Sequence, residues 1–486
     1  MSAVITGLEP KPIWDHFARI SKIPRPSKSE GKIAAHVIEL ARKLDLEVKQ
    51  DDTGNVVVRK AASPGKADSQ TVAVQSHLDM VCEKNRDVTH DFDREGIELV
   101  RADGYVKASG TTLGSDNGIG VAAALSVMLD NSLVHGPLEF LFTVDEETGL
   151  TGASGLTPGF LKSKVLLNLD SEEEGALYIG CSGGRDTLLT LPVERELAPK
   201  GFVPVGLAVA GLRGGHSGLD IHAGRGNALK LLVRALWQIA TSIDIHVSHL
   251  EGGGKRNAIP REAEAVIYAK EQQLEALRNK ASKINSVLKN EYSTVEPNLL
   301  LKITESKPVS NGGVLKVADQ DRLLSLLYGL PHGVVAMSAD IPGLVETSTN
   351  LATVQTETES VIVGTSHRSS VNSALENIAT TVGVIGRLAG AKAEHTDGYP
   401  GWQPNLNSTA LKVTKQTYVQ LFGKDPEIKA IHAGLECGII GQKFPGMDMV
   451  SFGPTIEGAH SPDERVEIAT VQKFWDLLTG VLNNLA

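Results

Sequence analysis

Short apolar runs that end in acidic or histidine residues constrain the fold of this chain more than any other feature. The runs 72–75, 138–144 and 165–169 have the length and composition of buried strands. A segment rich in Ala, Val and Leu with a helical pattern, 118–130, separates the first two. Strands that alternate with helices favour an α/β fold, in which helices flank a mainly parallel sheet.

The order of segments indicates two domains, one inserted into the other. A new strand pattern begins at 203–210, and strands and helices then alternate for almost two hundred residues (about one domain). Near the C-terminus, the strand pattern at 449–452 and the helical patterns beside it are again like those of the first part of the chain. We therefore expect a discontinuous α/β domain of residues 1–185 and 398–486, interrupted by an α+β domain of residues 186–397.

Composition excludes several classes of protein. With 41% apolar and 22% charged residues, the 486-residue chain is typical of folded proteins. A net charge of −10 argues against nucleic-acid or anionic membrane partners, which require a basic surface. Three widely spaced cysteines fit a reducing compartment. The chain starts without a signal-peptide pattern and has no run of about 18 apolar residues, so we expect a soluble cytoplasmic protein.

Polar side chains follow each of the three central strand patterns. His77-Leu78-Asp79 comes after the first run, Asp145-Glu146-Glu147 ends the second, and Asp170 follows the third. Asp116 stands at the start of the helix between the first two strands. In open α/β sheets, ligands bind beyond the carboxyl ends of the strands. The sequence therefore predicts a functional site where these side chains meet.

Taken one at a time, each of these features also fits an ordinary structural role. A histidine after a strand is commonly a loop residue, and Asp116 could serve only as a helix N-cap. Glu146 and Glu147 could form a solvated turn, and Asp170 could begin the acidic run that continues to residue 174. The coincidence of all four at one sheet edge favours the site.

A further histidine lies near the C-terminus. His460 has a glycine two residues before it and follows the apolar run 449–452, so it could supply a second imidazole. A set of His, Asp and Glu ligands suits zinc, and manganese or cobalt tolerate it as well. A carboxylate that bridges two such ions would create a two-metal site, in which hydroxide attacks a carbonyl group.

The order of these residues resembles the di-zinc metallopeptidases of the M20 family, over nearly the whole chain. Four strings are most similar to the cytosolic aminoacyl-histidine dipeptidases of that family, a group that includes bacterial carnosinase-like enzymes. These strings are 76–80, 145–149, 432–438 and 458–463. The resemblance implies a discontinuous catalytic domain and an inserted domain that acts as a lid and in dimerisation.

The resemblance also implies a ligand set for two zinc ions per subunit. His77 and Asp170 would hold one zinc ion, and Glu147 and His460 would hold the other. Asp116 would bridge the two. Mn²⁺ or Co²⁺ could substitute for zinc.

Two acidic residues receive catalytic roles from the same resemblance. Asp79 would orient the His77 imidazole, a role whose loss typically costs about 10–100-fold in affinity or activity. Glu146 would be the general base that takes a proton from the attacking water and returns it to the leaving amine. The peptide bond that follows Asp116 would be cis, which is rare without proline.

The inserted segment carries the residues expected to bind substrate. His216 lies in a glycine-rich string and would reach the substrate carbonyl, although a glycine-turn histidine without a ligand is the simpler interpretation of the string alone. Asn257 and Arg368 would grip the carboxylate end, for which a guanidinium is well suited. Glu436 would meet the free amino group. A homodimer is also implied.

The sequence thus predicts zinc-dependent hydrolysis of small peptides, preferentially Xaa-His dipeptides similar to carnosine. Two alternatives stay open. An N-acyl-amino-acid amidohydrolase would use the same metal pair without requiring a free substrate amine. A noncatalytic peptide-binding or metal-binding protein would have no need of a proton-transferring Glu146 beside the ligands.

Overall fold

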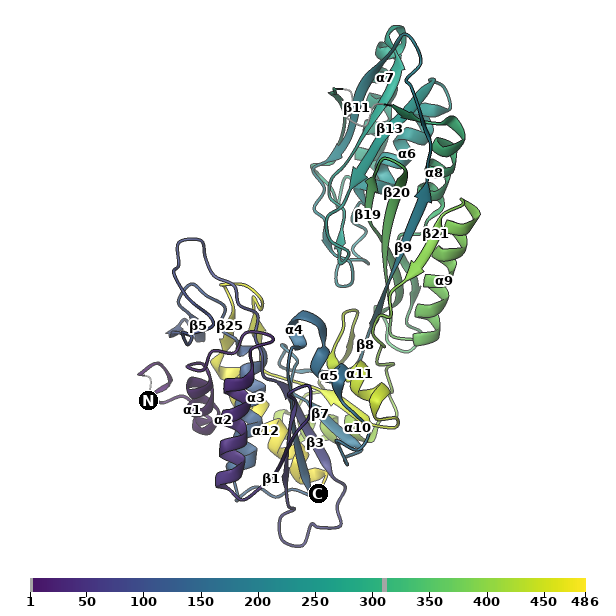
Figure 1. The fold of residues 1–486 in the computed structure, drawn as a ribbon. Coiled ribbons are helices and arrows are strands. Elements are labelled where there is room, and N and C mark those ends of the chain that lie inside the picture. The colour runs from purple at the N-terminus through teal and green to yellow at the C-terminus, as the bar shows by residue number, and fades with distance from the viewer. Residues whose placement is uncertain (1–2, 308–312) are drawn as a thin grey trace. The chain divides into compact units, whose positions relative to one another are not determined.

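The computed structural model describes residues 3–307 and 313–486, and its contacts divide the chain into two units (Figure 1). Unit 1 consists of Met1–Gly180, Trp402–Ala430 and Leu435–Ala486, and unit 2 of Cys181–Gly401 and Ile431–Gly434. The predicted insertion, 186–397, includes residues 308–312, which lie outside the described part. Each unit is described by itself.

Unit 1 is built on an eight-stranded sheet with the order β1-β2-β6-β3-β7-β23-β8-β22. Strand β3 is parallel to β6 and β7, and β7 is parallel to β23, whereas β1–β2, β2–β6 and β23–β8 are antiparallel. The predicted α/β class is therefore confirmed, with parallel pairing in the central strands. The strands are β1 (Glu47–Gln50), β2 (Val56–Lys60), β3 (Val72–His77), β6 (Leu138–Thr143), β7 (Val165–Asn168), β8 (Ala176–Cys181), β22 (Glu427–Ile431) and β23 (Asp448–Ser451).

Helices cover the central strands of unit 1, and this explains why those strands are buried along their whole length. Every residue of β3, β6 and β7 is buried. Helix α3 packs against β3 and α1, and α10 packs against α12 and β23. The helices are η1 (Ala3–Ile5), α1 (Lys11–Ile20), α2 (Gly31–Lys43), α3 (Ser115–Leu129), α4 (Glu146–Gly149), α5 (Thr151–Gly155), α10 (Thr409–Phe422), α11 (Glu436–Lys443) and α12 (Ile468–Asn484).

A second, smaller sheet in unit 1 joins two segments that are far apart in the chain. Its order is β24-β25-β5-β4, and each pairing is antiparallel. This sheet brings the segment that follows His460 next to the segment that precedes α3. Its strands are β4 (Leu99–Ala102), β5 (Tyr105–Ala108), β24 (Ile456–Glu457) and β25 (Arg465–Glu467).

Unit 2 contains a nine-stranded sheet in which every described pairing is antiparallel. Its order is β16-β11-β15-β13-β19-β20-β9-β21, and β18 pairs with β19. The strands are β9 (Gly183–Pro192), β11 (Phe202–Ala210), β13 (Ile245–Gly252), β15 (Ala263–Lys270), β16 (Leu300–Glu305), β18 (Gly333–Met337), β19 (Val345–Thr356), β20 (Ser360–Ser369) and β21 (Lys392–His395). Two short pairs are β10 (Arg195–Glu196) with β17 (Val314–Leu315), and β12 (Gly215–His216) with β14 (Ala258–Ile259).

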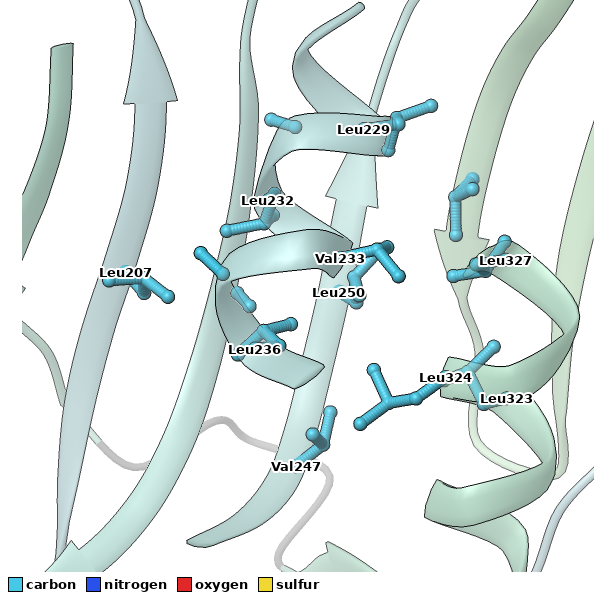
Figure 2. Packing of buried hydrophobic residues seen from close by; sticks show 14 of the residues in the cluster. Leu207, Leu229, Leu232, Val233, Leu236, Val247, Leu250, Leu323, Leu324 and Leu327 are labelled. Carbon is cyan, nitrogen blue, oxygen red and sulfur yellow. The ribbon is translucent and has the colours of Figure 1, made fainter. Parts of the chain in front are cut away.

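Helices pack on this sheet and bury a leucine-rich core. The apolar positions of α6 recur at helical spacing, so Leu229, Leu232 and Leu236 lie with strand residues such as Leu207 and with leucines of α8, as Figure 2 shows. The helices are α6 (Ala228–Ala240), η2 (Glu271–Gln273), α7 (Leu274–Glu291), α8 (Val317–Gly329) and α9 (Asn372–Leu388). Within the described ranges of both units, no helix combines the length and apolar character needed to cross a membrane.

Candidate active site

Three neighbouring strands of unit 1 deliver candidate ligands to one edge of the sheet. Strand β3 ends at His77, β6 ends three residues before Glu146, and β7 ends two residues before Asp170. Because these strands are parallel and adjacent, their carboxyl ends meet. The acidic and histidine residues predicted from the sequence therefore lie together.

Asp116 stands between the two histidines. His77 Nε2 lies 3.0 Å from Asp116 Oδ1 and 3.2 Å from Asp170 Oδ1. His460 Nε2 lies 3.2 Å from Asp116 Oδ2 and 3.0 Å from Glu147 Oε2. The donor atoms of each of these two triads lie within 4.8 Å of one another. The geometry is that of two adjacent cation sites that share one carboxylate.

The donor set fits a pair of divalent cations. Glu147 has its other oxygen, Oε1, buried without a hydrogen-bond partner among the described residues. A buried, unsatisfied carboxylate oxygen is costly, and a bound cation would remove that cost. Two imidazoles and three carboxylates match the ligand preference of zinc and its neighbours.

The positive charge of the two protonated histidines balances the negative charge of the surrounding carboxylates. Burial alone would lower the pKa of His77, but Asp170 and Asp116 outweigh it and raise this pKa well above its ordinary value. Hydrogen bonds to Asp116 and Glu147 raise the pKa of His460 to about 11. Since metal ligands must be deprotonated, metal binding here would displace these protons.

The carboxyl groups respond to the same environment in different ways. Burial would raise the pKa of Asp116, but hydrogen bonds with His460 and His77 hold it below its usual range. Burial raises the pKa of Asp170 to about 6, and it raises the pKa of Glu146 well above the ordinary value. For Glu146 the shift favours the protonated form, which a general base reaches once it has acted.

Asp79 connects the first histidine to the helix that carries the two glutamates. Its Oδ1 accepts the Glu146 N–H at 3.1 Å and lies 3.3 Å from His77 Nδ1. Its Oδ2 accepts the Glu147 N–H at 3.2 Å and the Ser27 hydroxyl at 2.8 Å. One buried carboxylate thus fixes both the imidazole and the start of α4 (Glu146–Gly149).

The turn that carries Asp116 is irregular. The peptide bond between Asp116 and Asn117 is cis, as the sequence resemblance implied. The Asn117 amide donates to Leu169 O at 2.9 Å and also to Asp170 Oδ1. These bonds attach the turn to the end of β7 (Val165–Asn168).

Glu436, predicted to bind substrate, lies in unit 1 at the first position of α11. Its Oε2 accepts hydrogen bonds from Gln75 Nε2 and Thr143 Oγ1, both at 2.6 Å. Its Oε1 is buried and has no hydrogen-bond partner in the described part of the chain. Burial raises the pKa of Glu436 to about 8. Glu436 is therefore a buried carboxyl group whose Oε1 can still accept a hydrogen bond.

The other predicted substrate residues belong to unit 2. His216 Nδ1 accepts the N–H groups of Gly218 at 3.2 Å and Leu219 at 3.0 Å. Because burial lowers the pKa of His216, the ring is neutral and its one proton is assigned to Nε2. This tautomer can donate a hydrogen bond to a negatively charged oxygen. His216 and Asn257 line one cavity of about 1330 Å³ within unit 2.

Arg368 is not among the lining residues of that cavity. It lies on β20 (Ser360–Ser369), where Nη1 donates to Tyr399 Oη at 3.0 Å. Its Nε is buried and lacks a hydrogen-bond partner among the residues that the structure describes. The guanidinium therefore retains capacity to bind an anion.

Sequence reasoning missed two buried charged residues that contact the ligand-bearing loops, Arg25 and Glu464. Glu464 stands four residues after His460, one position beyond the string 458–463. Arg25 lies between α1 and α2, where no periodic pattern singles it out. Both residues contact loops that are far away in the chain, so no local sequence pattern indicates these contacts.

Comparisons with known proteins identify the family. The model of peptidase family M20/M25/M40 matches residues 73–484. The chain is 43% identical over 482 residues to cytosol non-specific dipeptidase of Escherichia coli (strain K12), which covers 99% of each chain.

Two solved structures are also similar to this chain. The structure of aminoacylhistidine dipeptidase from Vibrio alginolyticus has 42% sequence identity and a TM-score of 0.92, covering 99% of this chain and 98% of that one. Aminopeptidase PepT from Bacillus cereus shares the fold, with a TM-score of 0.57 at 16% identity, and covers 98% of this chain and 99% of its own.

Proposed function

Because the chain belongs to peptidase family M20/M25/M40 and is a peptide-bond hydrolase, we propose that it cleaves dipeptides, preferentially those of the Xaa-His type. Both full-length relatives are named dipeptidases, and the Vibrio alginolyticus protein is named for aminoacylhistidine substrates. The observation that carries the proposal is the position of Asp116, whose two carboxylate oxygens face two different histidines at 3.0 and 3.2 Å.

Two zinc ions are the proposed cofactors, with manganese or cobalt as possible substitutes. His77 and Asp170 would hold one ion, Glu147 and His460 the other, and Asp116 both. When bound, such ions lower the pKa of water and polarise the substrate carbonyl.

Glu146 is the proposed general base. Its backbone is fixed by the hydrogen bond to Asp79, and its carboxyl group is one of a triad of donor groups with His77 and Glu147. Adjacent positions in α4 thus offer one carboxylate for a ligand role and one for proton transfer. Glu146 would take the proton of the attacking water and deliver it to the leaving amine.

Substrate recognition is proposed for four residues on the basis of their individual chemistry. The free oxygen of Glu436 suits the ammonium group of a dipeptide. Arg368 suits its carboxylate, because a guanidinium offers paired donors. The Nε2–H of His216 suits the oxyanion that forms during hydrolysis. Asn257 is the fourth, a further donor for the carboxylate end. A cytosolic homodimer is proposed with them, and the name of the Escherichia coli relative supports the cytosolic location.

The test is hydrolysis of a small substrate panel by metal-free and zinc-reloaded protein. The panel contains β-Ala-His, Gly-His, Ala-Ala, a tripeptide that ends in histidine, and an N-acetylated histidine dipeptide. Free histidine is measured, or free alanine for Ala-Ala. We expect zinc-dependent cleavage of dipeptides with a free amine, fastest for Xaa-His.

Other outcomes would redirect the assignment. Cleavage of the acetylated compound alone would identify an N-acyl-amino-acid amidohydrolase. Equal rates for Ala-Ala and Gly-His would remove the histidine preference and leave a broad dipeptidase. Binding of dipeptides at full zinc occupancy without turnover would identify a noncatalytic protein.

A further inference from the structure

Glu464 binds the loop that leads to Asp116 through nearly every donor that the loop offers. Its Oε2 accepts the N–H groups of Leu113 at 2.8 Å and Gly114 at 2.9 Å. Its Oε1 accepts the Ser115 N–H at 2.7 Å, the Ser115 hydroxyl at 2.6 Å and the Asp116 N–H at 3.3 Å. The Glu464 side chain is buried, so these bonds are shielded from water.

Arg25 holds the same loop through one of its carbonyl groups. One guanidinium nitrogen, Nη2, donates to Gly114 O. The other, Nη1, donates to Leu78 O at 3.0 Å and Asp79 O at 2.8 Å, in the segment that follows His77. The side chain is fully buried. Arg25 therefore links the loop of Asp116 to the loop of His77.

The two glycines of the Gly114–Gly118 string make room for this guanidinium. Gly114 has φ 70°, and a Cβ there would lie 2.6 Å from Arg25 Nη2 and 2.7 Å from Met80 Sδ. A Cβ on Gly118 would lie 2.8 Å from the same Arg25 nitrogen. The space that side chains would need at both positions is occupied by a cation.

We propose that Glu464 and Arg25 are positioning residues that fix Asp116 between the two metal ions. The Glu464 carboxylate accepts hydrogen bonds from the N–H groups of the loop, and the Arg25 guanidinium donates one to the Gly114 carbonyl. Asp116 therefore cannot shift without breaking charge-assisted hydrogen bonds. The proposal rests on the metal site of the proposed function.

The same pair connects three of the chain segments that carry candidate ligands, those of His77, Asp116 and His460. Glu464 is tied to the turn of His460, because its N–H donates to Ser461 O at 3.0 Å. Through Glu464 the turn of His460 is attached to the loop of Asp116, and through Arg25 that loop is attached to the segment after His77. Both side chains are buried, so removing either one would leave buried loop N–H or carbonyl groups without their hydrogen-bond partner, which is costly.

The chain offers a matched control in Glu139 on β6. This residue is also buried, and its Oε2 accepts the N–H groups of Lys162 and Ser163 and the Ser163 hydroxyl at 2.8 to 2.9 Å. Its Oε1 pairs with Arg59 Nε at 2.8 Å. Glu139 thus anchors a loop in the way Glu464 does, but it contacts none of the candidate ligands.

The experiment compares Glu464→Gln with Glu139→Gln in the full-length protein. Zinc affinity is measured by competition with a chelator, together with the thermal midpoint of the metal-free form and with kcat and KM. Glu464→Gln is expected to weaken zinc binding by about 10–100-fold and to lower kcat while KM is retained. Glu139→Gln is expected to lower the thermal midpoint without changing zinc affinity.

Wild-type zinc affinity in Glu464→Gln, with a thermal loss like that of Glu139→Gln, would overturn the proposal and leave Glu464 a structural residue. Should Glu464→Gln fail to fold, Arg25→Lys decides, because lysine keeps the charge but loses the fork that reaches three carbonyls. Unchanged zinc affinity in Arg25→Lys would equally overturn it. If the wild-type protein binds no zinc, the proposed metal site itself fails.

Discussion

Two consecutive glutamates, Glu146 and Glu147, take different places at the same helix start. Both belong to one group of donors with His77, and Glu147 Oε2 also lies 3.0 Å from His460 Nε2, in a second group with Asp116. Both backbone N–H groups are bound by Asp79. The contact with His460 is why we propose the ligand role for Glu147 and the base role for Glu146.

Substitution of the proposed base should separate turnover from metal binding. Glu146→Gln keeps the size of the side chain but cannot accept the proton, so we expect kcat to fall by about 10²–10⁴-fold. Bound zinc, measured by elemental analysis, should stay at the wild-type level. Glu147→Gln is the matched control, and it should lose zinc. Retained turnover in Glu146→Gln, or loss of its zinc, would contradict the assigned role.

At the scale of single residues, the sequence predicted the residues that follow strands and missed those that act from a distance. His77, Glu147 and Asp170 stand out because each comes directly after an apolar run. Glu464 binds Ser115 across 349 positions of the chain, and no local pattern encodes such a contact. The contact between Glu464 and this loop exists only in the folded protein.

At the scale of elements, the buried central strands were predictable and the short strands of the small sheet were not. The pattern 72–75 corresponds to β3, and 138–144 to β6, because strands buried on both faces are rich in apolar residues. The strands β4, β5, β24 and β25 of the small sheet have two to four residues and mixed exposure, so their pattern is too weak to detect. The predicted helix 118–130 corresponds to the regular part of α3, because Asp116 and Asn117 before it have non-helical backbone angles.

One buried histidine of unit 2 predicts a pH dependence of stability. His367 of β20 is fully buried, and its ring nitrogens lie 2.8 Å from Thr187 Oγ1 on β9 and 2.9 Å from Thr349 Oγ1 on β19. Burial lowers the pKa of His367 from 6.5 to about 4. Between these values the unfolded chain binds the proton more strongly, so acidification destabilises the fold.

The expected loss from His367 is about 2 kcal/mol of unfolding free energy between pH 7.5 and pH 5. His367→Gln can still hydrogen-bond with both threonines but does not titrate, so its stability should fall less over this range. Denaturant unfolding of metal-free protein at the two pH values measures this, because bound metal would add its own pH dependence. Equal losses in both proteins would show that His367 does not titrate as described.

At the scale of the whole molecule, each unit has its own core, while the candidate metal ligands all belong to unit 1. The contacts assign the segment Ile431–Gly434 to unit 2 and its flanks to unit 1, a change that nothing in the local composition signals. The lid and dimerisation roles of the inserted segment, and its boundaries at 186 and 397, stay predictions.

This division predicts that the core of unit 2 can be weakened without loss of the metal site. Leu232 of α6 is fully buried in the leucine-rich core (Figure 2). Leu232→Ala should cost about 2–5 kcal/mol of stability through the cavity it creates. Calorimetry should show a lower unfolding transition, while zinc affinity is unchanged. A parallel fall in zinc affinity would contradict the independence of the site.

The central claim is that Asp116 serves two metal ions that hydrolysis requires. The most direct test is a zinc titration of metal-free wild-type protein and of Asp116→Ala, with bound zinc and β-Ala-His turnover followed together. We predict two ions for each wild-type chain, turnover that appears as they bind, and loss of both tight sites and of turnover in Asp116→Ala. Turnover of the metal-free protein, or two tightly bound ions in Asp116→Ala, would contradict the account.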